Sequence, residues 1–192
     1  ISTRDDAYGD LYVMNADGSA VTRLTNDDAR ELKGIDQWPT WSPDGGKIAF
    51  QRNDVDATGV YGNCAIWVVN ADGSGLTRLG GGVQSWQPAW SPDGSRIAFR
   101  SHDGQSCCLG IFVMTADGSG VTRLTNGTPG WEDEHPTWTP DGRIVFTRYI
   151  PVPGVPNAAE AKLHVMNPDG SGVRMLNQPL GEMAAWSSAR RP

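Results

Sequence analysis

The chain has 192 residues, a formal net charge of −6, 24 glycines, 13 prolines and eight tryptophans. The acidic balance argues against nucleic-acid binding, because a phosphate backbone needs a basic face and the arginines do not cluster in sequence. Without an apolar run of about eighteen residues no membrane-spanning segment is predicted, and the glycine, proline and tryptophan content favours many short strands joined by tight turns.

Two motifs alternate along the chain. The first, which reads LYVMNADGSAVTRLT in its first copy, begins at Leu11, Ile66, Ile111 and Leu163. The second, W-S-P-D-G, begins at Trp41 and Trp90, with the variants W-T-P-D-G at Trp138 and W-S-S at Trp186. The second motif recurs after 49, 48 and 48 residues, so four copies of each motif indicate an internal repeat.

Each motif contains a turn that folds one strand back on the next. In Pro-Asp-Gly, proline fixes φ and glycine accepts a positive φ, so PTW or PAW pairs with KIAF, RIAF or RIVF. Ala-Asp-Gly-Ser likewise joins YVM or FVM to VTRLT. One repeat is therefore a four-stranded antiparallel sheet, and because such a sheet cannot bury both faces alone, its copies are expected to stack around an axis as propeller blades.

The aspartate before each of these glycines is interpreted as a turn residue that bonds its own backbone, because the same residue recurs in every blade. These residues are Asp17, Asp44, Asp72, Asp93, Asp117, Asp141 and Asp169. The arginines of the last strand are expected to protect an exposed sheet edge from pairing with other chains. They are Arg23, Arg78, Arg123 and Arg174.

The segments W-S-P-D-G, I-A-F and V-M-N-A-D-G-S-G-x-T-R-L-T resemble the repeat of TolB-like β-propellers over nearly the whole chain. The resemblance implies an all-β propeller of four-stranded antiparallel blades, about four in this chain, with one blade split between the termini. We expect one domain over residues 1–192, with repeats at about 1–35, 36–84, 85–133 and 134–182 and a closing strand at 183–192. TolB-like propellers serve as periplasmic adaptors, accessory domains of peptidases and surface proteins, so the resemblance implies an architecture rather than an activity.

The order of the strands is staggered, because the chain starts at a second strand, 1–4, and ends at a first strand, 184–186. Three arrangements close such ends: a four-bladed ring, part of a six-bladed ring, or donation of the last strand to another copy. TolB-like proteins usually have six blades, which favours strands shared between subunits. Assembly into a homo-oligomer or filament is therefore one hypothesis.

The first strand of each blade is expected to line the central channel, where the residues before each Trp motif vary between blades. The candidates for a ligand site at the channel mouth are Asp36, Trp38, Trp86, Gln87, Asp133, Glu134, His135 and Glu182. Glu132, Asp133 and Glu134 offer oxygen ligands to calcium, with a solvated acidic loop as the alternative. Trp38, Trp86 and Trp131 break the repeat period and offer a stacking surface to a glycan or peptide.

No catalytic residue is predicted, because none of His102, His135 and His164 has an evident Ser or Cys partner and no G-x-S-x-G elbow occurs. Cys64 is expected in a loop equivalent to that of Cys107 and Cys108. A bridge from Cys64 to either, or a vicinal bridge, would indicate an oxidising compartment. Asn126 begins an N-G-T sequon for N-glycosylation.

The sequence thus predicts a non-catalytic periplasmic or secreted scaffold that binds a protein partner or its own copies and needs no cofactor. Two other readings stay open. One is a ligand-binding module that holds calcium or a glycan at the channel mouth. The other is an accessory propeller domain of a serine peptidase.

Overall fold

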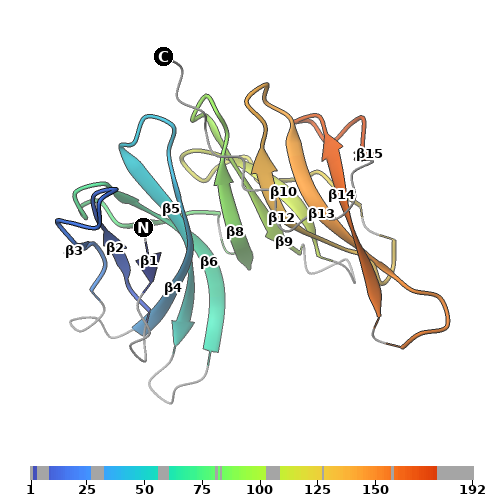
Figure 1. Cartoon of the computed structure of the whole chain (residues 1–192), viewed down its shortest axis with the longest axis horizontal. Coiled ribbons are helices and arrows are strands. Elements are labelled where there is room, and N and C mark those ends of the chain that lie inside the picture. Colours follow the sequence, from blue (N-terminus) through green and yellow to red (C-terminus); the bar gives the residue numbers. More distant parts are fainter. Residues whose placement is uncertain are drawn as a thin grey trace.

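The computed structural model describes residues 2–3, 9–26, 33–55, 61–80, 82, 84–102, 109–126, 128–156 and 158–176. Within these residues the chain is all-β and forms four antiparallel sheets (Figure 1). The sheets follow one another from β1–β3 at one end to β12–β15 at the other. The predicted all-β fold of antiparallel sheets is confirmed, whereas the predicted closing strand at 183–192 lies outside the described residues. No helix in the described part of the chain is long and apolar enough to cross a membrane.

Strands that are consecutive in the sequence are neighbours in every sheet. The first sheet contains β1 (Ser2–Thr3), β2 (Leu11–Val13) and β3 (Thr22–Arg23). The second contains β4 (Lys33–Trp41), β5 (Lys47–Val55), β6 (Tyr61–Asn70) and β7 (Thr77–Arg78). The third contains β8 (Ser85–Trp90), β9 (Arg96–Ser101), β10 (Gly110–Thr115) and β11 (Thr122–Arg123). The fourth contains β12 (Glu132–Trp138), β13 (Ile144–Pro151), β14 (Ala159–Met166) and β15 (Arg174–Met175).

The turn aspartates act as the sequence predicts. The carboxylate of Asp17 accepts the amide of Ser19 at 2.9 Å, and Gly18 between them has a φ of 84°. The carboxylate of Asp44 accepts the amide of Gly46 at 3.0 Å and the hydroxyl of Ser42 at 2.6 Å. Because each carboxylate satisfies turn groups that the strands leave unpaired, these aspartates stabilise the hairpins locally.

Apolar clusters fill the three joints between consecutive sheets. We call the face of a sheet that packs on the preceding sheet its leading face. The opposite face, which packs on the following sheet, is its trailing face. The phenylalanine of each second strand lies on the leading face and is fully buried; these residues are Phe50, Phe99 and Phe146. Burial of a side chain of this size stabilises the fold by roughly 1.5–3 kcal/mol, so the joints supply most of the core.

The tryptophans of the repeated motif pack between sheets, but not equally. Trp90 and Trp138 are buried, and the indole of Trp138 donates to the carbonyl of Ala89 in β8 at 3.1 Å. Trp41 is exposed, since the described part of the first sheet has only three strands and no inner strand on which this indole can pack. Trp186 lies outside the described residues.

The arginines of the outer strands do not form one equivalent set. In the antiparallel pairing of the last two strands, Arg23 lies opposite Tyr12 and Arg123 lies opposite Phe112. In the fourth sheet Met175 takes the equivalent position, opposite His164, so Arg174 lies one residue before it. The Nε atoms of Arg23 and Arg123 donate to the carbonyls of Thr25 and Thr125 at 2.9 and 2.7 Å. Edge protection therefore describes these two arginines poorly: they tie the outer strand to the segment that follows it.

We predict that stability falls in the acid range because the turn aspartates must then be protonated. Hydroxyl and then amide donors lower the pKa of Asp93 and Asp117 from 3.8 to about 2. The unfolded state therefore binds more protons in this range, so the stabilisation is present above about pH 4 and is lost by about pH 2. Urea unfolding followed by circular dichroism across this range measures the effect.

The matched test combines Asp93→Asn with Asp117→Asn. The double variant is expected to lose less stability than the wild type as the pH falls through the acid range. The control is Glu160→Gln, which removes an exposed ion pair with Lys162 and leaves the turns intact. A double variant with the same acid dependence as the wild type contradicts the assignment.

Candidate functional site

Three equivalent bulges distort the inner strands β4, β8 and β12. The antiparallel register shifts between Gln37 and Thr40, between Trp86 and Ala89, and between Glu134 and Thr137. The residues with positive φ in these bulges are Trp38, Gln87 and His135, at 54°, 54° and 52°. Each precedes a proline, which has no amide hydrogen to donate to the sheet.

Left-handed conformations of such residues are uncommon and cost about 1–3 kcal/mol, and they concentrate at functional sites. Side chains of neighbouring sheets hold two of the three in place. The carbonyl oxygen of the Gln51 side chain accepts the amide of Gln87 at 3.3 Å. The side-chain carbonyl oxygen of Gln87 in turn accepts a hydrogen bond from the backbone amide of His135 at 2.9 Å. Gln87 is therefore both a bulge residue and the support of the next bulge.

The bulges bring side chains of three sheets together. The rings of Trp38 and His135, from the second and fourth sheets, lie 5.6 Å apart between centroids and are tilted by 59°. Beside them opens a cavity of about 310 Å³. Its lining is Trp38, Gln87 and His135, the prolines Pro39, Pro88 and Pro136 that follow them, and Thr137, Val145, Thr147 and Leu163. Trp38 is 45% exposed.

This cavity combines a largely apolar lining with a few polar groups. Trp38, the three prolines, Val145 and Leu163 offer a surface for aliphatic or ring-shaped groups. Gln87, His135 and two threonines offer hydrogen bonds that can orient them. Such a lining is typical of small binding sites. Trp38, Gln87 and His135, three of the predicted ligand-site residues, line this cavity, and their role in binding a ligand stays a prediction.

Asp36 and Asp133, by contrast, are not at the mouth. The Asp36 carboxylate is fully buried and accepts two hydrogen bonds from Arg52, each of 2.6 Å. It also accepts the hydroxyl of Thr25 at 2.7 Å, and that hydroxyl accepts the amide of Leu11. Asp36 therefore links the second sheet to the first and is a structural residue.

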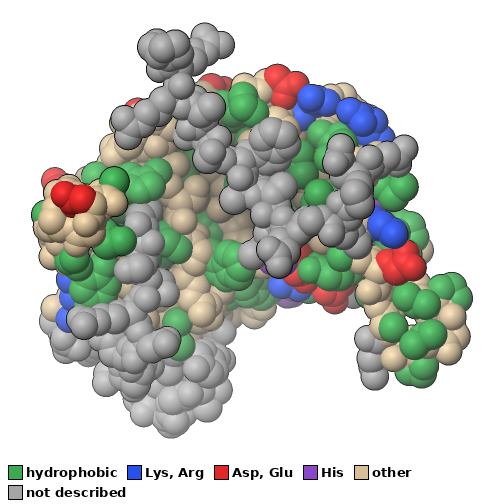
Figure 2. Space-filling model, viewed as in Figure 1, with side chains coloured by type: hydrophobic (Ala, Val, Ile, Leu, Met, Phe, Trp, Pro, Cys, Tyr) green, Lys and Arg blue, Asp and Glu red, His purple; other side chains and the backbone are tan. Residues whose placement is uncertain are grey.

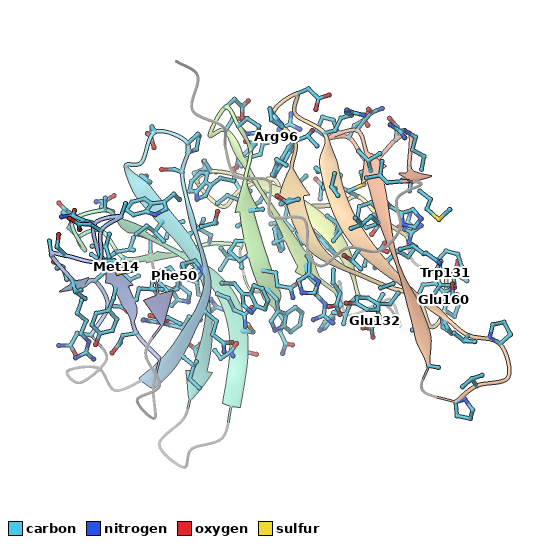
Figure 3. All side chains as sticks on the ribbon, in the orientation of Figure 1. Met14, Phe50, Arg96, Trp131, Glu132 and Glu160 are labelled. Atoms are coloured by element: carbon cyan, nitrogen blue, oxygen red, sulfur yellow. The ribbon has the colours of Figure 1, made fainter. Side chains whose placement is uncertain are left out.

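The fourth sheet, two repeats later, contains an equivalent pair. Arg148 donates to both oxygens of Asp133, at 2.6 and 2.8 Å, and its guanidinium lies 5.4 Å from the ring centroid of Trp131. Trp131, labelled beside the fourth sheet in Figure 3, is not among the residues that line the cavity. In the third sheet Ser85 and Ser101 face each other at these positions. The sequence prediction missed both arginines because they lie fifteen or sixteen residues from their partners.

A charged cluster lies beside the cavity, between the third and fourth sheets. Arg100 contacts Glu134 at 2.7 Å and Glu132 at 3.5 Å, and its guanidinium lies 5.6 Å from the ring of Trp86. Burial raises the pKa of Glu134 above its usual value, against the opposing effect of Arg100. Trp86 and Glu134 therefore both contact Arg100 and do not line the cavity.

The predicted calcium ligands are engaged elsewhere. Asp133 binds Arg148, while Glu132 and Glu134 bind Arg100. Within the described residues no three side chains of the His, Cys, Asp and Glu types come together to hold a metal ion. Calcium binding stays a prediction that these contacts do not support, and Glu182 lies outside the described residues.

The predicted loop position of Cys64 is wrong, because β6 already begins at Tyr61 and contains it. The thiol is free and buried, and it donates to the carbonyl of Ser85 at 3.3 Å. Burial raises its pKa to about 12. Cys107 and Cys108 lie outside the described residues, so a disulfide stays a prediction. Asn126 is exposed, and its glycosylation is likewise untested.

Several basic side chains of the described surface lie close to acidic ones. On the face shown in Figure 2, basic side chains of the described residues lie beside acidic ones. Arg143 with Asp141 and Lys162 with Glu160 are two exposed pairs of this kind. These contacts do not test the prediction that the chain does not bind nucleic acid.

Comparison with known proteins identifies the repeat. The family model described as the TolB beta propeller domain matches residues 1–190. A search of curated proteins found no match. Among solved structures, a protein assigned as a TolB from Agrobacterium tumefaciens is 26% identical with a TM-score of 0.66, over 89% of this chain and 57% of that one. The chain thus spans little more than half the length of that relative.

Two more distant structures show the fold alone. Hydrazine synthase from Kuenenia stuttgartiensis is 18% identical with a TM-score of 0.65, over 87% of this chain and 28% of that one. A structure from a study of two prolyl endopeptidases is 16% identical with a TM-score of 0.62, over 91% of this chain and 27% of that one. The same architecture therefore occurs within larger proteins of different activity.

The buried pair of Asp36 and Arg52 yields a stability prediction. Asp36→Ala removes both hydrogen bonds that the buried guanidinium of Arg52 makes with this carboxylate, and we expect the free energy of unfolding to fall by about 3–5 kcal/mol. Adding Arg52→Met also removes the buried guanidinium and is expected to restore most of the loss. Glu160→Ala, which breaks only an exposed pair, is the control and should change stability by less than about 1 kcal/mol. Chemical denaturation measures all three, and equal losses in the single and double variants contradict the prediction.

Proposed function

Because the chain belongs to the TolB β-propeller domain family, we propose that it is a non-catalytic protein-binding module that acts outside the cytoplasm and holds an extended segment of a partner protein at the Trp38 cavity. One observation carries the proposal. Three residues with left-handed backbone conformation line one largely apolar cavity: Trp38, Gln87 and His135. Strain repeated in three sheets and directed at one site is expected where a surface has been shaped for binding.

The lining favours a peptide segment over a compact polar ligand. Trp38 is exposed, whereas tryptophan side chains are usually mostly buried in folded proteins. Tryptophan is also among the residues that contribute most to the binding energy of protein interfaces. The three prolines add flat apolar surface without amide hydrogens that would need partners. Gln87 and His135 supply side-chain hydrogen-bonding groups beside them, which suits an extended backbone with apolar side chains.

Four titratable groups outside the cavity lining are buried or bound by arginines, which supports a non-catalytic role. The thiol of Cys64 is buried with a pKa raised to about 12, so it stays protonated at neutral pH and is a poor nucleophile. Burial lowers the pKa of His164, whose ring stacks on Phe146 at 5.6 Å. The carboxylates of Asp36 and Asp133 are bound by arginines and are not available as bases.

The location outside the cytoplasm is what the family resemblance implies for a propeller of this type. The accessory-domain hypothesis gains no separate support, because the likeness to prolyl endopeptidases at 16% identity shows the fold alone. A glycan at the same cavity is the other outcome that the binding experiment can reveal.

Peptide selection tests the proposal. Twelve-residue random peptides displayed on phage are selected on the immobilised chain, and the affinity of the selected peptides is measured by calorimetry. We expect Trp38→Ala to weaken binding at least tenfold, about 1.4 kcal/mol, because the exposed indole is the largest apolar group of the lining.

Val155→Ala is the matched control, since Val155 is also exposed and apolar but lies in the β13–β14 connection. Its affinity for the same peptides should equal that of the wild type. Selected peptides that bind Trp38→Ala as tightly as the wild type would place the binding surface elsewhere. Failure to select peptides, together with Trp38-dependent binding to a glycan array, would favour the glycan hypothesis.

A further inference from the structure

The connection between β13 and β14 forms an exposed apolar arm. We use this name for residues 151–156, whose sequence is Pro-Val-Pro-Gly-Val-Pro. Val155 is 52% exposed, and no residue of the arm carries a charge. Figure 1 shows this connection, in orange, extending beyond the sheets, and Figure 2 shows hydrophobic side chains gathered on the same projection. An apolar segment held in water away from the core is typical of an interaction surface.

The repeat does not account for the arm, because the equivalent connections of two other sheets have polar sequences. The connection between β5 and β6 contains Asp56 and Thr58. That between β9 and β10 contains Asp103 and Gln105. The uncharged, proline-rich sequence is therefore a particular feature of the fourth sheet.

The backbone of the arm suits an apolar environment. Three of its six residues are prolines, which have no amide hydrogen. The amide of Val152 donates to the carbonyl of Ala158 at 2.9 Å, and the amide of Val155 donates to the carbonyl of Val152 at 3.2 Å. Within the described residues, Gly154 has the only amide of the arm that makes no hydrogen bond. Because so few donors need a new partner, the arm can leave water for an apolar site at little cost.

The arm cannot fold back into the Trp38 cavity of its own chain. The cavity lies against β13 and β14 at Thr147 and Leu163, and these two strands stay paired from there to Pro151. Four residues of an extended strand span about 13 Å, so this ladder holds the arm away from the cavity. Any contact between the two must therefore be made with another molecule.

We propose that the arm of one chain docks into the Trp38 cavity of a second copy. This inference rests on the proposed function, since it names the extended segment that the cavity binds. Trp38, Val145 and Leu163 offer apolar surface to the valines and prolines of the arm. The hydroxyls of Thr137 and Thr147 can donate hydrogen bonds to its carbonyl oxygens. Each copy then contributes a segment to the binding site of another copy.

The solution mass across a dilution series tests the proposal on the 192-residue chain. We expect light scattering to show a mass that rises above 20.6 kDa as the concentration increases. Val155→Asp places a charge in the arm and should raise the concentration needed for association about tenfold or more, because the charge would enter an apolar site. Trp38→Ala, on the other side of the contact, should do the same. Both side chains are exposed, so both variants are expected to fold, as circular dichroism can verify.

Val173→Asp is the matched control, because Val173 is another exposed valine of the fourth sheet, in the connection between β14 and β15. This variant should associate like the wild type. A wild type that stays monomeric throughout overturns the proposal. So does association that either Val155→Asp or Trp38→Ala leaves unchanged.

A synthetic peptide of residues 149–160 separates this contact from the proposed function. The peptide is titrated by calorimetry into the Val155→Asp chain, whose cavity is expected to be free of another arm. Addition of Trp38→Ala to this chain should weaken peptide binding about tenfold. If the phage-selected peptides, measured below the association range, need Trp38 but the arm peptide does not bind, the proposed function stands and the arm proposal fails. If neither kind of peptide binds, both proposals fail.

Discussion

The structure depends on the burial of two faces for every sheet. A four-stranded sheet of this repeat has an apolar leading face and an apolar trailing face, and each can be removed from water only by a neighbouring sheet. Phe50, Phe99 and Phe146 fill the joints from one side, while small residues such as Ala49 and Ala98 receive them from the other. The same packing brings the turns at Gly73, Gly118 and Gly170 close to a leucine of the preceding sheet. These leucines are Leu24, Leu79 and Leu124, respectively. Those glycines are needed for the joint as well as for the turn.

The cavity is a consequence of how the joints bring the inner strands together. The prolines after Trp38, Gln87 and His135 withdraw a donor from each inner strand, so the ladder shifts there and a bulge forms. Because consecutive sheets are held in contact by their apolar faces, the side chain of Gln51 can reach the next bulge, and that of Gln87 the one after. The positions of these polar contacts thus depend on the same hydrophobic joints that hold the sheets together.

Local signals in the sequence predicted the sheets and turns well, because Pro-Asp-Gly and Ala-Asp-Gly-Ser determine hairpins over a few residues. Register at longer range was less predictable. Arg174 resembled the other outer-strand arginines in sequence but sits one residue away from their position, and Asp36 resembled a channel residue although Arg52 holds it in the interior. Cys64 was expected in a loop because the length of the β5–β6 hairpin is not encoded in its turn motif. The proline after each variable residue was the available signal for the bulges.

The third sheet shows how a shift of one residue changes a joint. Arg52 and Arg148 lie four residues after Ile48 and Ile144 and pair with buried aspartates in their own sheets. Arg100 lies only three residues after Ile97, and because successive side chains of a strand point to opposite faces, its guanidinium reaches forward to Glu132 and Glu134 of the fourth sheet. Serines take the vacated positions at Ser85 and Ser101. The arginine–carboxylate pair, which lies within one sheet in the second and fourth sheets, therefore joins two sheets here. It lies beside the cavity, because Glu134 is next in sequence to His135, which lines it. An arginine placed one residue earlier in the repeat can therefore bring charge beside the cavity without altering the apolar joints that hold the sheets together.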